Sequence, residues 1–366
     1  RQFFLPYVAP VLWNAAMIAT LVALGSRLDV RSLVLALGWG ALLGGALQFA
    51  VQLPRVLALE PALRPRWDLG RPEVREAVRN AGPAILGRGV VQLGGMVDLF
   101  LASLLGQGAV AMLGYAQTLY LLPISLFGMS VAAAELPELA RQRAGEPQAL
   151  ARRVEAGLRQ MAVFVVPSAV GYLALGDILV AGLFQTGAFG GGDALAVSIV
   201  LAGYTLGLLA STATRLFASA FFALRDTGTP ARCALVRIAL AAALGYTLMI
   251  PFSRLEAGGQ ALGAAGLTVA AGAAAWVEWA LLRRALRRRI GPVRSPAGQL
   301  ARLAGAAAVA AALGRTTVAV LPPLHPALAA AAAFVPFAIA YFAAARFLGV
   351  PEASAVALRL ARRLRG

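Results

Sequence analysis

Four charged side chains interrupt long apolar runs of this sequence, and they are the residues best placed to do chemistry: Arg88, Asp98, Glu135 and Arg215. A charge at the centre of a membrane helix costs roughly 2.5–3.5 kcal/mol, so such residues commonly mark a hydrated interior or a ligand site. A guanidinium can donate two parallel hydrogen bonds to phosphate oxygens, which suits a cationic cavity for a pyrophosphate group. The alternative is that Arg88 and Glu135 lie near helix ends and reach the membrane surface.

The spacing of these residues limits how they can act together. Arg88 and Asp98 are ten residues apart on one expected helix, which separates them by about 15 Å along its axis, so they cannot pair directly. Arg215 lies on another expected helix, which should face the same interior if the helices form a bundle. We therefore predict that Arg88, Asp98 and Arg215 line a shared cavity.

The composition indicates a membrane protein with many spans. The chain has 366 residues, of which 60% are hydrophobic and only 13% charged, and its mean hydropathy is +0.76. A soluble domain carries about 25% charged residues, and here the deficit extends along the whole chain. The sequence opens on RQFFLPYVAP without an initiator methionine or a signal-peptide pattern, so we expect the natural N-terminus to lie further upstream.

Other classes of function find little support in the composition. With one cysteine, Cys233, and one histidine, His325, the chain cannot form an internal disulfide or a familiar Cys/His metal site. No carboxylate pair or nucleophile–base pair is evident, so we expect a transporter without a cofactor rather than an enzyme. The net charge of +17 comes from arginine clusters between apolar runs, which argues against a nucleic-acid partner.

Ten apolar runs are long enough to cross a bilayer, which takes about 20 helical residues. They fall near 6–25, 31–53, 74–105, 110–140, 155–176, 194–224, 229–251, 261–282, 298–321 and 326–348. A last segment, 351–366, is basic and amphipathic and is expected to lie on the membrane surface. The predicted fold class is therefore an all-α polytopic membrane protein with about ten transmembrane helices.

The arginines alternate between the connections of these runs. Most of them lie in the even-numbered connections and the tail, and the sixth region is taken to include Arg225, Arg232 and Arg237. The odd-numbered connections contain only Arg27, Arg31, Arg254 and Arg315. Because cytoplasmic loops are enriched in basic residues, we predict that the even-numbered connections and the C-terminus are cytoplasmic. A miscounted span would break the alternation, so the pattern supports a count of ten.

Six stretches carry a resemblance to a known family: LPYVAPVLWNAAMI (5–18), LQFAVQLPRV (47–56), NAGPAILGRGVVQLGGMVDLFLASLLGQGAV (80–110), LYLLPISLFGMSVAAAELPELAR (119–141), LFQTGAF (183–189) and RLFASAFFALRDTGTP (215–230). In this order and spacing, over residues 1 to about 290, they resemble the murein lipid II flippases. These form the MurJ/MviN family of the multidrug, oligosaccharidyl-lipid and polysaccharide (MOP) exporter superfamily.

The resemblance implies a place for each part of the chain in a fourteen-helix, two-lobe transporter. The ten spans resemble helices five to fourteen, so four helices of the N-terminal lobe would lie outside this sequence, and the chain by itself is expected to be inactive. The implied parts are the last two helices of the N-terminal lobe (1–53), a basic cytoplasmic linker (54–73), a six-helix C-terminal lobe (74–290), two C-terminal helices that form a groove for a lipid tail (291–350) and a cytoplasmic tail (351–366).

The resemblance also implies a function. Family members move lipid II, a polyprenyl-pyrophosphate-linked precursor of peptidoglycan, across the bacterial cytoplasmic membrane by alternating access. Membrane lipids and cell-wall synthesis proteins are the other expected partners. Two alternatives stay open, namely a flippase for another polyprenyl-linked glycan and a non-transporting scaffold of cell-wall synthesis. Export of a small drug cation is disfavoured, because the intramembrane charges include two arginines.

The clearest departure from the family lies at residues 115–118. Family members commonly have Tyr-Ala-Asp-Arg there, whereas this chain has Tyr-Ala-Gln-Thr. Gln117 and Thr118 are therefore expected in the substrate cavity without the family's arginine, which a threonine hydroxyl cannot replace at phosphate. Arg88 lies where the family usually has an apolar residue, and we hypothesise that it supplies the missing charge. Replacing Arg88 with Met in the intact protein should then abolish transport.

Two sites are candidates for a hinge or gate. Pro123 interrupts the run 110–140 and should kink it, because proline removes a helical hydrogen bond. The resemblance implies a cavity-lining helix that bends there, and a static kink is the alternative; Glu135 lies near the end of the same run. In the sixth connection, Asp226 is expected to cap a tight turn, and Arg225 with Asp226 could hold an inward-facing state.

Ion coupling rests on Asp98. The resemblance implies that some members bind sodium in the C-terminal lobe through a carboxylate on the corresponding helix, with Asn and Asp on the helix that matches 229–251. That run offers Gly245, Tyr246 and Thr247 instead, and a hard cation needs several oxygen ligands. Sodium is therefore not favoured, and uptake of a proton by Asp98 is the alternative. The energy source stays open between the membrane potential, a proton and sodium.

Overall fold

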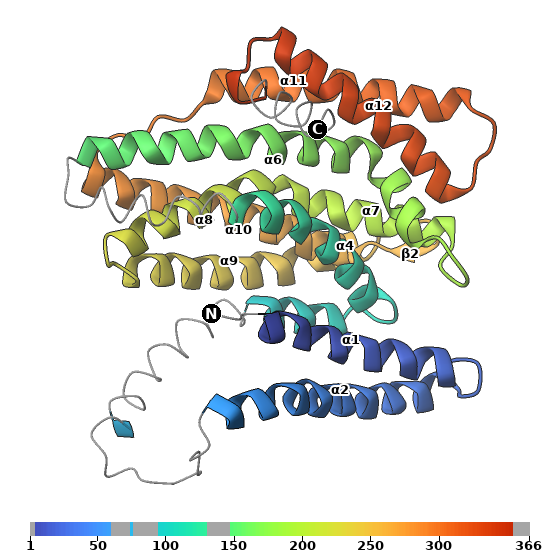
Figure 1. Ribbon diagram of the computed structural model, residues 1–366. Coiled ribbons are helices and arrows are strands. Elements are labelled where there is room, and N and C mark those ends of the chain that lie inside the picture. Colours follow the sequence, from blue (N-terminus) through green and yellow to red (C-terminus); the bar gives the residue numbers. More distant parts are fainter. Residues whose placement is uncertain (1–3, 60–73, 76–93, 130–146, 354–366) are drawn as a thin grey trace, which may run out of the picture. The chain divides into compact units, whose positions relative to one another are not determined.

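The computed structural model describes residues 4–59, 74–75, 94–129 and 147–353, and Figure 1 shows how their helices are arranged within each part of the chain. The chain divides into two compact units, residues 1–80 and 81–366. The first unit contains α1 (Phe4–Leu24) and α2 (Val30–Leu59), which pack against each other. The second contains the helices from Gly94 onward that the structure describes.

Small residues let α1 and α2 approach each other closely. A Cβ atom added to Gly40 would collide with Thr20 Oγ1, and one added to Gly44 would lie 2.9 Å from Trp13 Cα. Contacts of this kind are typical of membrane helices, because lipid offers no hydrophobic driving force between them and close van der Waals packing takes its place.

The second unit is a bundle of helices with one small hairpin. Its elements are the helix Gly94–Ser103, α4 (Ala109–Pro123), η1 (Ile124–Met129), α6 (Pro147–Phe184), α7 (Gly191–Leu206), α8 (Leu208–Ala223), α9 (Gly228–Phe252), β1 (Glu256–Ala257), β2 (Gln260–Ala261), α10 (Gly263–Ile290), α11 (Ala297–Val320) and α12 (Pro326–Phe347). The strands β1 and β2 form a two-residue antiparallel pair between α9 and α10.

The helix α10 lies at the centre of this unit and packs against α9, α7 and α8. Figure 1 shows α6 on the other side of α7 and α8, and α11 with α12 as an outer layer over α6. The contact of α11 is made of small side chains, because Ala306, Ala307, Ala310 and Ala311 are all buried against α6 and α12.

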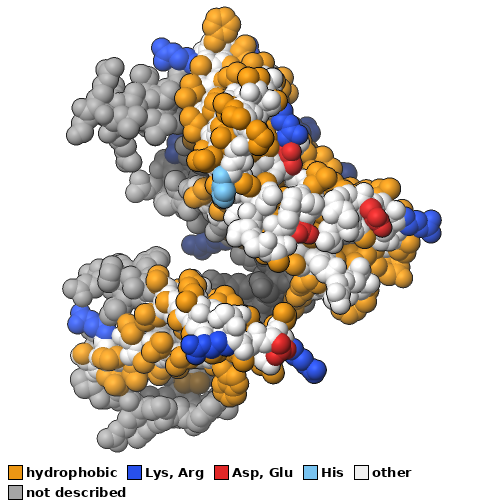
Figure 2. Space-filling model, turned by 90° about the vertical axis from the view of Figure 1, so that its right-hand side faces the viewer, with side chains coloured by type: hydrophobic (Ala, Val, Ile, Leu, Met, Phe, Trp, Pro, Cys, Tyr) orange, Lys and Arg blue, Asp and Glu red, His pale blue; other side chains and the backbone are white. Residues whose placement is uncertain are grey.

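Seven of the described helices are long and apolar enough to cross a membrane, or eight if the bent pair α7–α8 counts as one span. Ala9–Leu24 and Gly94–Ser103 are shorter apolar helices that fall within two further expected runs. Large apolar side chains are also exposed, among them Trp39, Val320 and Phe347, and Figure 2 shows hydrophobic side chains over much of one face. The prediction of a multi-pass, all-α membrane protein is confirmed, whereas the count of ten and the orientation of the C-terminus stay predictions.

One expected helix, 194–224, is wrong as a single element. It consists of α7 and α8, which meet at Gly207 with a bend of 44°. A Cβ atom on Gly207 would lie 2.6 Å from Gly272 Cα of α10, and one on Gly203 would collide with Thr268. The helices cross α10 at these glycines, and Trp276 Nε1 donates a hydrogen bond of 2.8 Å to the carbonyl of Leu206 at the break.

Candidate functional site

An ion pair joins two membrane-spanning helices of the second unit. Arg237 Nη1 on α9 lies 3.1 Å from Glu278 Oε2 on α10. At 1.5 Å per residue, both residues lie roughly 13–18 Å from the nearest ends of their helices, Gly228 and Ile290. The Glu278 side chain is only 6% exposed and that of Arg237 is 32% exposed. Either charge alone would be costly at such a depth, so the two stabilise each other.

Asp98 lies close to this pair. The helix Gly94–Ser103 packs against α9, since a Cβ atom on Gly94 would lie 3.4 Å from Ile238 Cγ1 and one on Gly245 would lie 3.5 Å from Leu101 Cδ1. Asp98 lies between these two contacts, is half-buried and interacts electrostatically with Arg237. A position inside the bundle, as the sequence predicts, is what a carboxylate with a role in transport would require.

Arg215 approaches the same region from α8. Its side chain is exposed on the described unit, yet it interacts electrostatically with Arg237 and Glu278. The structure therefore gathers two carboxylates and two guanidinium groups from four helices. We call this group the charge cluster: Asp98, Arg215, Arg237 and Glu278.

Aromatic and hydroxyl groups pack beside the charge cluster. The Tyr120 hydroxyl of α4 donates a hydrogen bond of 2.7 Å to Ser211 Oγ, one turn before Arg215 on α8. The Tyr120 ring stacks on Tyr204 of α7, with 4.8 Å between the ring centroids. Tyr204 and Tyr120 are both buried, so they fix the positions of α4, α7 and α8 around the charges.

Gln117 and Thr118 lie on the exposed face of α4, together with Gly114. The Thr118 hydroxyl donates to the Gly114 carbonyl of the preceding turn at 2.9 Å. A hydroxyl held in this way by its own helix offers only its acceptor lone pairs to a ligand. The exposure of Gln117 and Thr118 within their unit is what residues of a cavity wall would show.

Pro123 ends α4, and a π-helical turn, Ile124–Met129, follows it directly. The hydrogen bonding therefore changes from α- to π-helical at Pro123, and the kink expected there stays a prediction. Such turns are rare and frequently lie at functional sites. A hinge at Pro123 stays a prediction, while Arg88 and Glu135 lie outside the described residues.

Asp226 caps the start of α9, as predicted. Its carboxylate accepts hydrogen bonds from the Thr229 backbone N–H at 2.9 Å and the Thr229 hydroxyl at 2.8 Å. Arg289 Nη2, in the last turn of α10, lies 3.5 Å from Asp226 Oδ2. The Thr229 N–H bond, supported by the hydroxyl bond and the Arg289 charge, lowers the pKa of Asp226 below its ordinary value of 3.8. The neighbouring Arg225 is exposed and has a left-handed backbone, with φ +58°; its proposed gate role stays a prediction.

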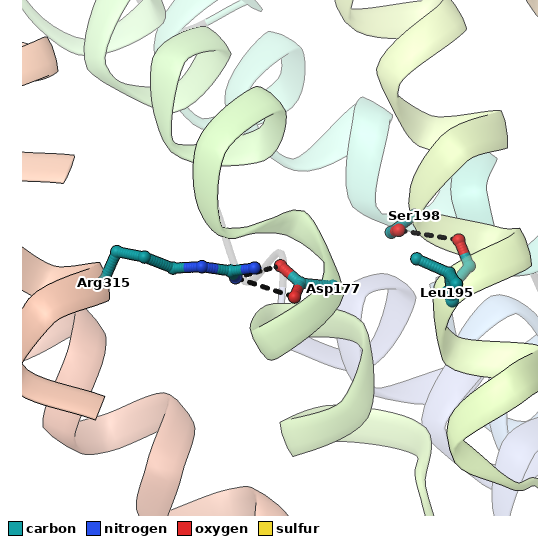
Figure 3. A network of polar contacts seen from close by, with 4 residues as sticks. All are labelled: Asp177, Leu195, Ser198 and Arg315. Carbon is teal, nitrogen blue, oxygen red and sulfur yellow. Dashed lines mark hydrogen bonds and ion pairs between the residues drawn. The ribbon is translucent and has the colours of Figure 1, made fainter. Parts of the chain in front are cut away.

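Another ion pair joins α6 and α11 (Figure 3). Arg315 Nη1 lies 2.7 Å from both carboxylate oxygens of Asp177. Both side chains are well exposed, at 53% and 37%, and both line a cavity of about 230 Å³ beside Ser198 of α7. The cavity lies near Leu175, where α6 leaves helical geometry with φ −128° and ψ 15°. This pair is more exposed than that of Arg237 and Glu278.

A sequence model of the family described as "Lipid II flippase MurJ" matches residues 1–362. The chain belongs to the MurJ family. The lipid II flippase MurJ of Burkholderia cenocepacia is 32% identical over 294 residues, which are 79% of this chain and 55% of the relative. The probable lipid II flippase MurJ of Haemophilus influenzae is 32% identical over 291 residues, 76% of this chain and 54% of the relative. This chain thus spans about half the length of the curated relatives it matches.

The fold of this MurJ-family chain matches that of a solved structure titled "Lipid II flippase MurJ, inward closed conformation". The TM-score is 0.76 with 19% sequence identity, over 95% of this chain and 68% of the other. At this identity the likeness establishes the fold. The resemblance drawn from the sequence motifs is therefore confirmed at the level of both family and fold.

The described residues near Asp98 do not fit the sodium site that the resemblance implies for some MurJ-family members. On α9, Gly245 has no side chain, Tyr246 is exposed, and the Thr247 hydroxyl donates to carbonyls of its own helix at 2.9 and 3.2 Å. The charged neighbour of Asp98 on α9 is Arg237, which is itself a cation. A hard metal ion needs several oxygen ligands and no adjacent positive charge.

Sequence reasoning missed both members of the Arg237–Glu278 pair. Arg237 was assigned to the sixth connection, and this is wrong, because it lies nine residues inside α9. Glu278 lies within the expected span 261–282, in the stretch WVEWALL, but was not among the intramembrane charges singled out. The rule that selected Asp98 would have found Glu278, since both are carboxylates inside apolar runs.

Proposed function

We propose that the protein is a lipid II flippase, which translocates the lipid-linked peptidoglycan precursor across the bacterial cytoplasmic membrane for cell-wall synthesis. The observation that carries this proposal is the family match over residues 1–362. The two curated relatives are named lipid II flippase MurJ and probable lipid II flippase MurJ. The proposed substrate is a polyprenyl-pyrophosphate-linked glycan, and no covalent chemistry is needed to move it.

Alternating access suits the breaks in the helices. A transporter that opens first to one side and then to the other needs helices that bend at defined places. The second unit has a 44° bend at Gly207 between α7 and α8 and a π-helical turn after Pro123. Irregular backbone of this kind is tolerated at membrane depth where it is buried in protein or lines a water-filled cavity. We assign these two breaks as the hinges.

The substrate face of the second unit is proposed to run along α4 and α8. Gln117 and Thr118 are exposed on α4, and Arg215 is exposed on α8. The Tyr120–Ser211 hydrogen bond of 2.7 Å ties these two helices together. Arg215 and Arg88 are the proposed cations for the pyrophosphate, because a guanidinium binds phosphate oxygens with paired hydrogen bonds. Asp98, on the helix Gly94–Ser103, is the candidate for proton uptake.

Two alternatives remain distinct from this proposal. The same machinery could move another polyprenyl-linked glycan, or the protein could serve as a non-transporting scaffold for cell-wall synthesis enzymes. The scaffold draws on one observation, namely Thr118 in the place of the family's arginine. If the protein were a scaffold, Arg88, Asp98 and Arg215 would be freely replaceable.

The test is complementation. The protein, expressed from its complete gene, is produced in bacteria depleted of their own lipid II flippase, and its C-terminus carries a reporter that is active only in the cytoplasm. We expect growth without lysis, together with reporter activity that places the C-terminus inside. Continued lysis in cells that contain inserted, abundant protein would contradict the proposal.

A further inference from the structure

We propose that Arg237 is a tethered cation, which holds the place between Asp98 and Glu278 that a metal ion would otherwise take, so that the protein binds no sodium there. This inference concerns the charge cluster, whose Arg237–Glu278 pair is used by no step of the proposed transport. Arg237 contacts Glu278 directly, with 3.1 Å between Nη1 and Oε2, and it also interacts electrostatically with Asp98.

The positive and negative charges of the cluster are equal in number. Asp98 and Glu278 contribute two negative charges, and Arg215 and Arg237 contribute two positive charges. A cluster within a membrane bundle is tolerated when its charges compensate one another, because each unpaired ion costs several kcal/mol to remove from water. A sodium ion added to this set would leave an excess positive charge. The balanced cluster therefore excludes a metal cation.

A guanidinium group has the chemistry to take the place of a metal ion between carboxylates. A guanidinium stays protonated at any physiological pH and has five N–H donors on a rigid plane, so one side chain can serve two carboxylates. Its long stem reaches from α9 to Glu278 on α10, and the partial exposure of Arg237, at 32%, leaves its further donors accessible. Unlike sodium, this cation cannot dissociate during a transport cycle.

The surroundings of Arg237 contain no further described carboxylate that could reverse this balance. The groups that interact with it come from five elements: Asp98 from the helix Gly94–Ser103, Tyr120 from α4, Tyr204 from α7, Arg215 from α8 and Glu278 from α10. The tyrosines are neutral and held by packing, since their rings stack on each other. The helix Gly94–Ser103, α9 and α10 are thus linked through one permanent charge.

A consequence for transport follows, and it rests on the proposed function. A flippase with a tethered cation should work equally well with or without a sodium gradient. The ion-binding part of the inference does not depend on what the protein transports, so it is tested on stability.

The experiment compares the melting temperature of the purified protein, expressed from its complete gene, in sodium chloride and in choline chloride at equal ionic strength. A ligand that binds only the folded state raises the melting temperature. We expect the same value in both salts for the unmodified protein. The variant Arg237→Ala should melt at a lower temperature in choline chloride, because Asp98 and Glu278 then lack their cation. Its melting temperature should rise with the sodium concentration, because sodium can then bind between the two carboxylates.

Two further variants control this measurement. Arg232→Ala removes an exposed arginine from the same helix and should match the unmodified protein in both salts. Arg237→Lys keeps a cation and should show no response to sodium, whereas a response in that variant would contradict the proposal. A saturable sodium-dependent rise in the unmodified protein would overturn the proposal. So would an Arg237→Ala variant without any sodium response, since the carboxylates would then form no place for a cation.

Discussion

Arg237 of α9 and Glu278 of α10 lie 3.1 Å apart inside the described bundle, and the same two helices meet again at their ends, where Arg289 Nη2 and Asp226 Oδ2 are 3.5 Å apart. The side chains of the outer pair are 65% and 21% exposed, and those of the inner pair are 32% and 6% exposed, so the more buried inner pair should contribute more to stability.

Removing one partner of the inner pair should be far more harmful than removing both. Glu278→Leu leaves Arg237 without its carboxylate and should lower the free energy of unfolding by about 3 kcal/mol. The double variant Arg237→Met/Glu278→Leu replaces the pair by apolar side chains and should lie within about 1 kcal/mol of the original protein. The check is a double-mutant cycle by denaturant titration in detergent, and additive losses would argue against a coupled pair.

The exposed pair of Asp177 and Arg315 provides a comparison on the same protein (Figure 3). Although both Arg315–Asp177 distances are 2.7 Å, water and salt screen these charges. Asp177→Asn should therefore change the free energy of unfolding by no more than about 1 kcal/mol. The same titration measures it, and a loss as large as that of Glu278→Leu would show that exposure does not set the difference.

The crossing of α7 and α8 with α10 should not tolerate a methyl group. The variant Gly207→Ala would place its Cβ 2.6 Å from Gly272 Cα, and overpacking of this kind costs about 1–3 kcal/mol. Gly305→Ala on α11 is the matched control, because a Cβ there meets nothing within 4 Å and alanine favours the helix. Melting temperatures of both variants decide the matter, and equal behaviour would refute a tight crossing.

The Asp226 cap should make stability depend on pH. The pKa of Asp226 is lowered in the folded protein, so the charged carboxylate stabilises the fold fully above its ordinary value of 3.8. That stabilisation is lost as the pH falls below 3.8 and passes the lower pKa that Asp226 has in the folded protein. Asp226→Ala should therefore cost about 1 kcal/mol near pH 7, and the difference should shrink toward pH 3. A difference independent of pH would contradict this role of the charge.

Much of the architecture could be predicted from the sequence, because a bilayer demands long apolar helices and Pro123 and Asp226 act locally. The bend at Gly207 could not, since it depends on the approach of Gly272, which is distant in sequence. The position of Arg237 could not be predicted either, because an error of a few residues in a predicted helix boundary moves an arginine from a loop into a span. Glu278 could have been found as a carboxylate inside an apolar run, but its pairing with Arg237 depends on the packing of α9 against α10.

Arg215 should matter for transport rather than for folding. Its side chain is exposed on the proposed substrate face, and loss of a charge-assisted hydrogen bond to phosphate costs enough to reduce binding about tenfold. Arg215→Gln should lower transport by that order and lower the melting temperature much less than Glu278→Leu does, because the Arg215 side chain is exposed. Arg284→Gln, an exposed arginine in the last turns of α10, should change neither. Full transport by Arg215→Gln would remove Arg215 from the substrate site.

The central claim is that this MurJ-family protein translocates lipid II. The most direct measurement is the amount of lipid II accessible at the outer face of the membrane in bacteria depleted of their own flippase and supplied with the complete gene. We predict that exposure of lipid II is restored, and that it is equal with and without a sodium gradient. An inserted and abundant protein that restores no exposure would contradict the claim and favour another lipid-linked glycan or a scaffold.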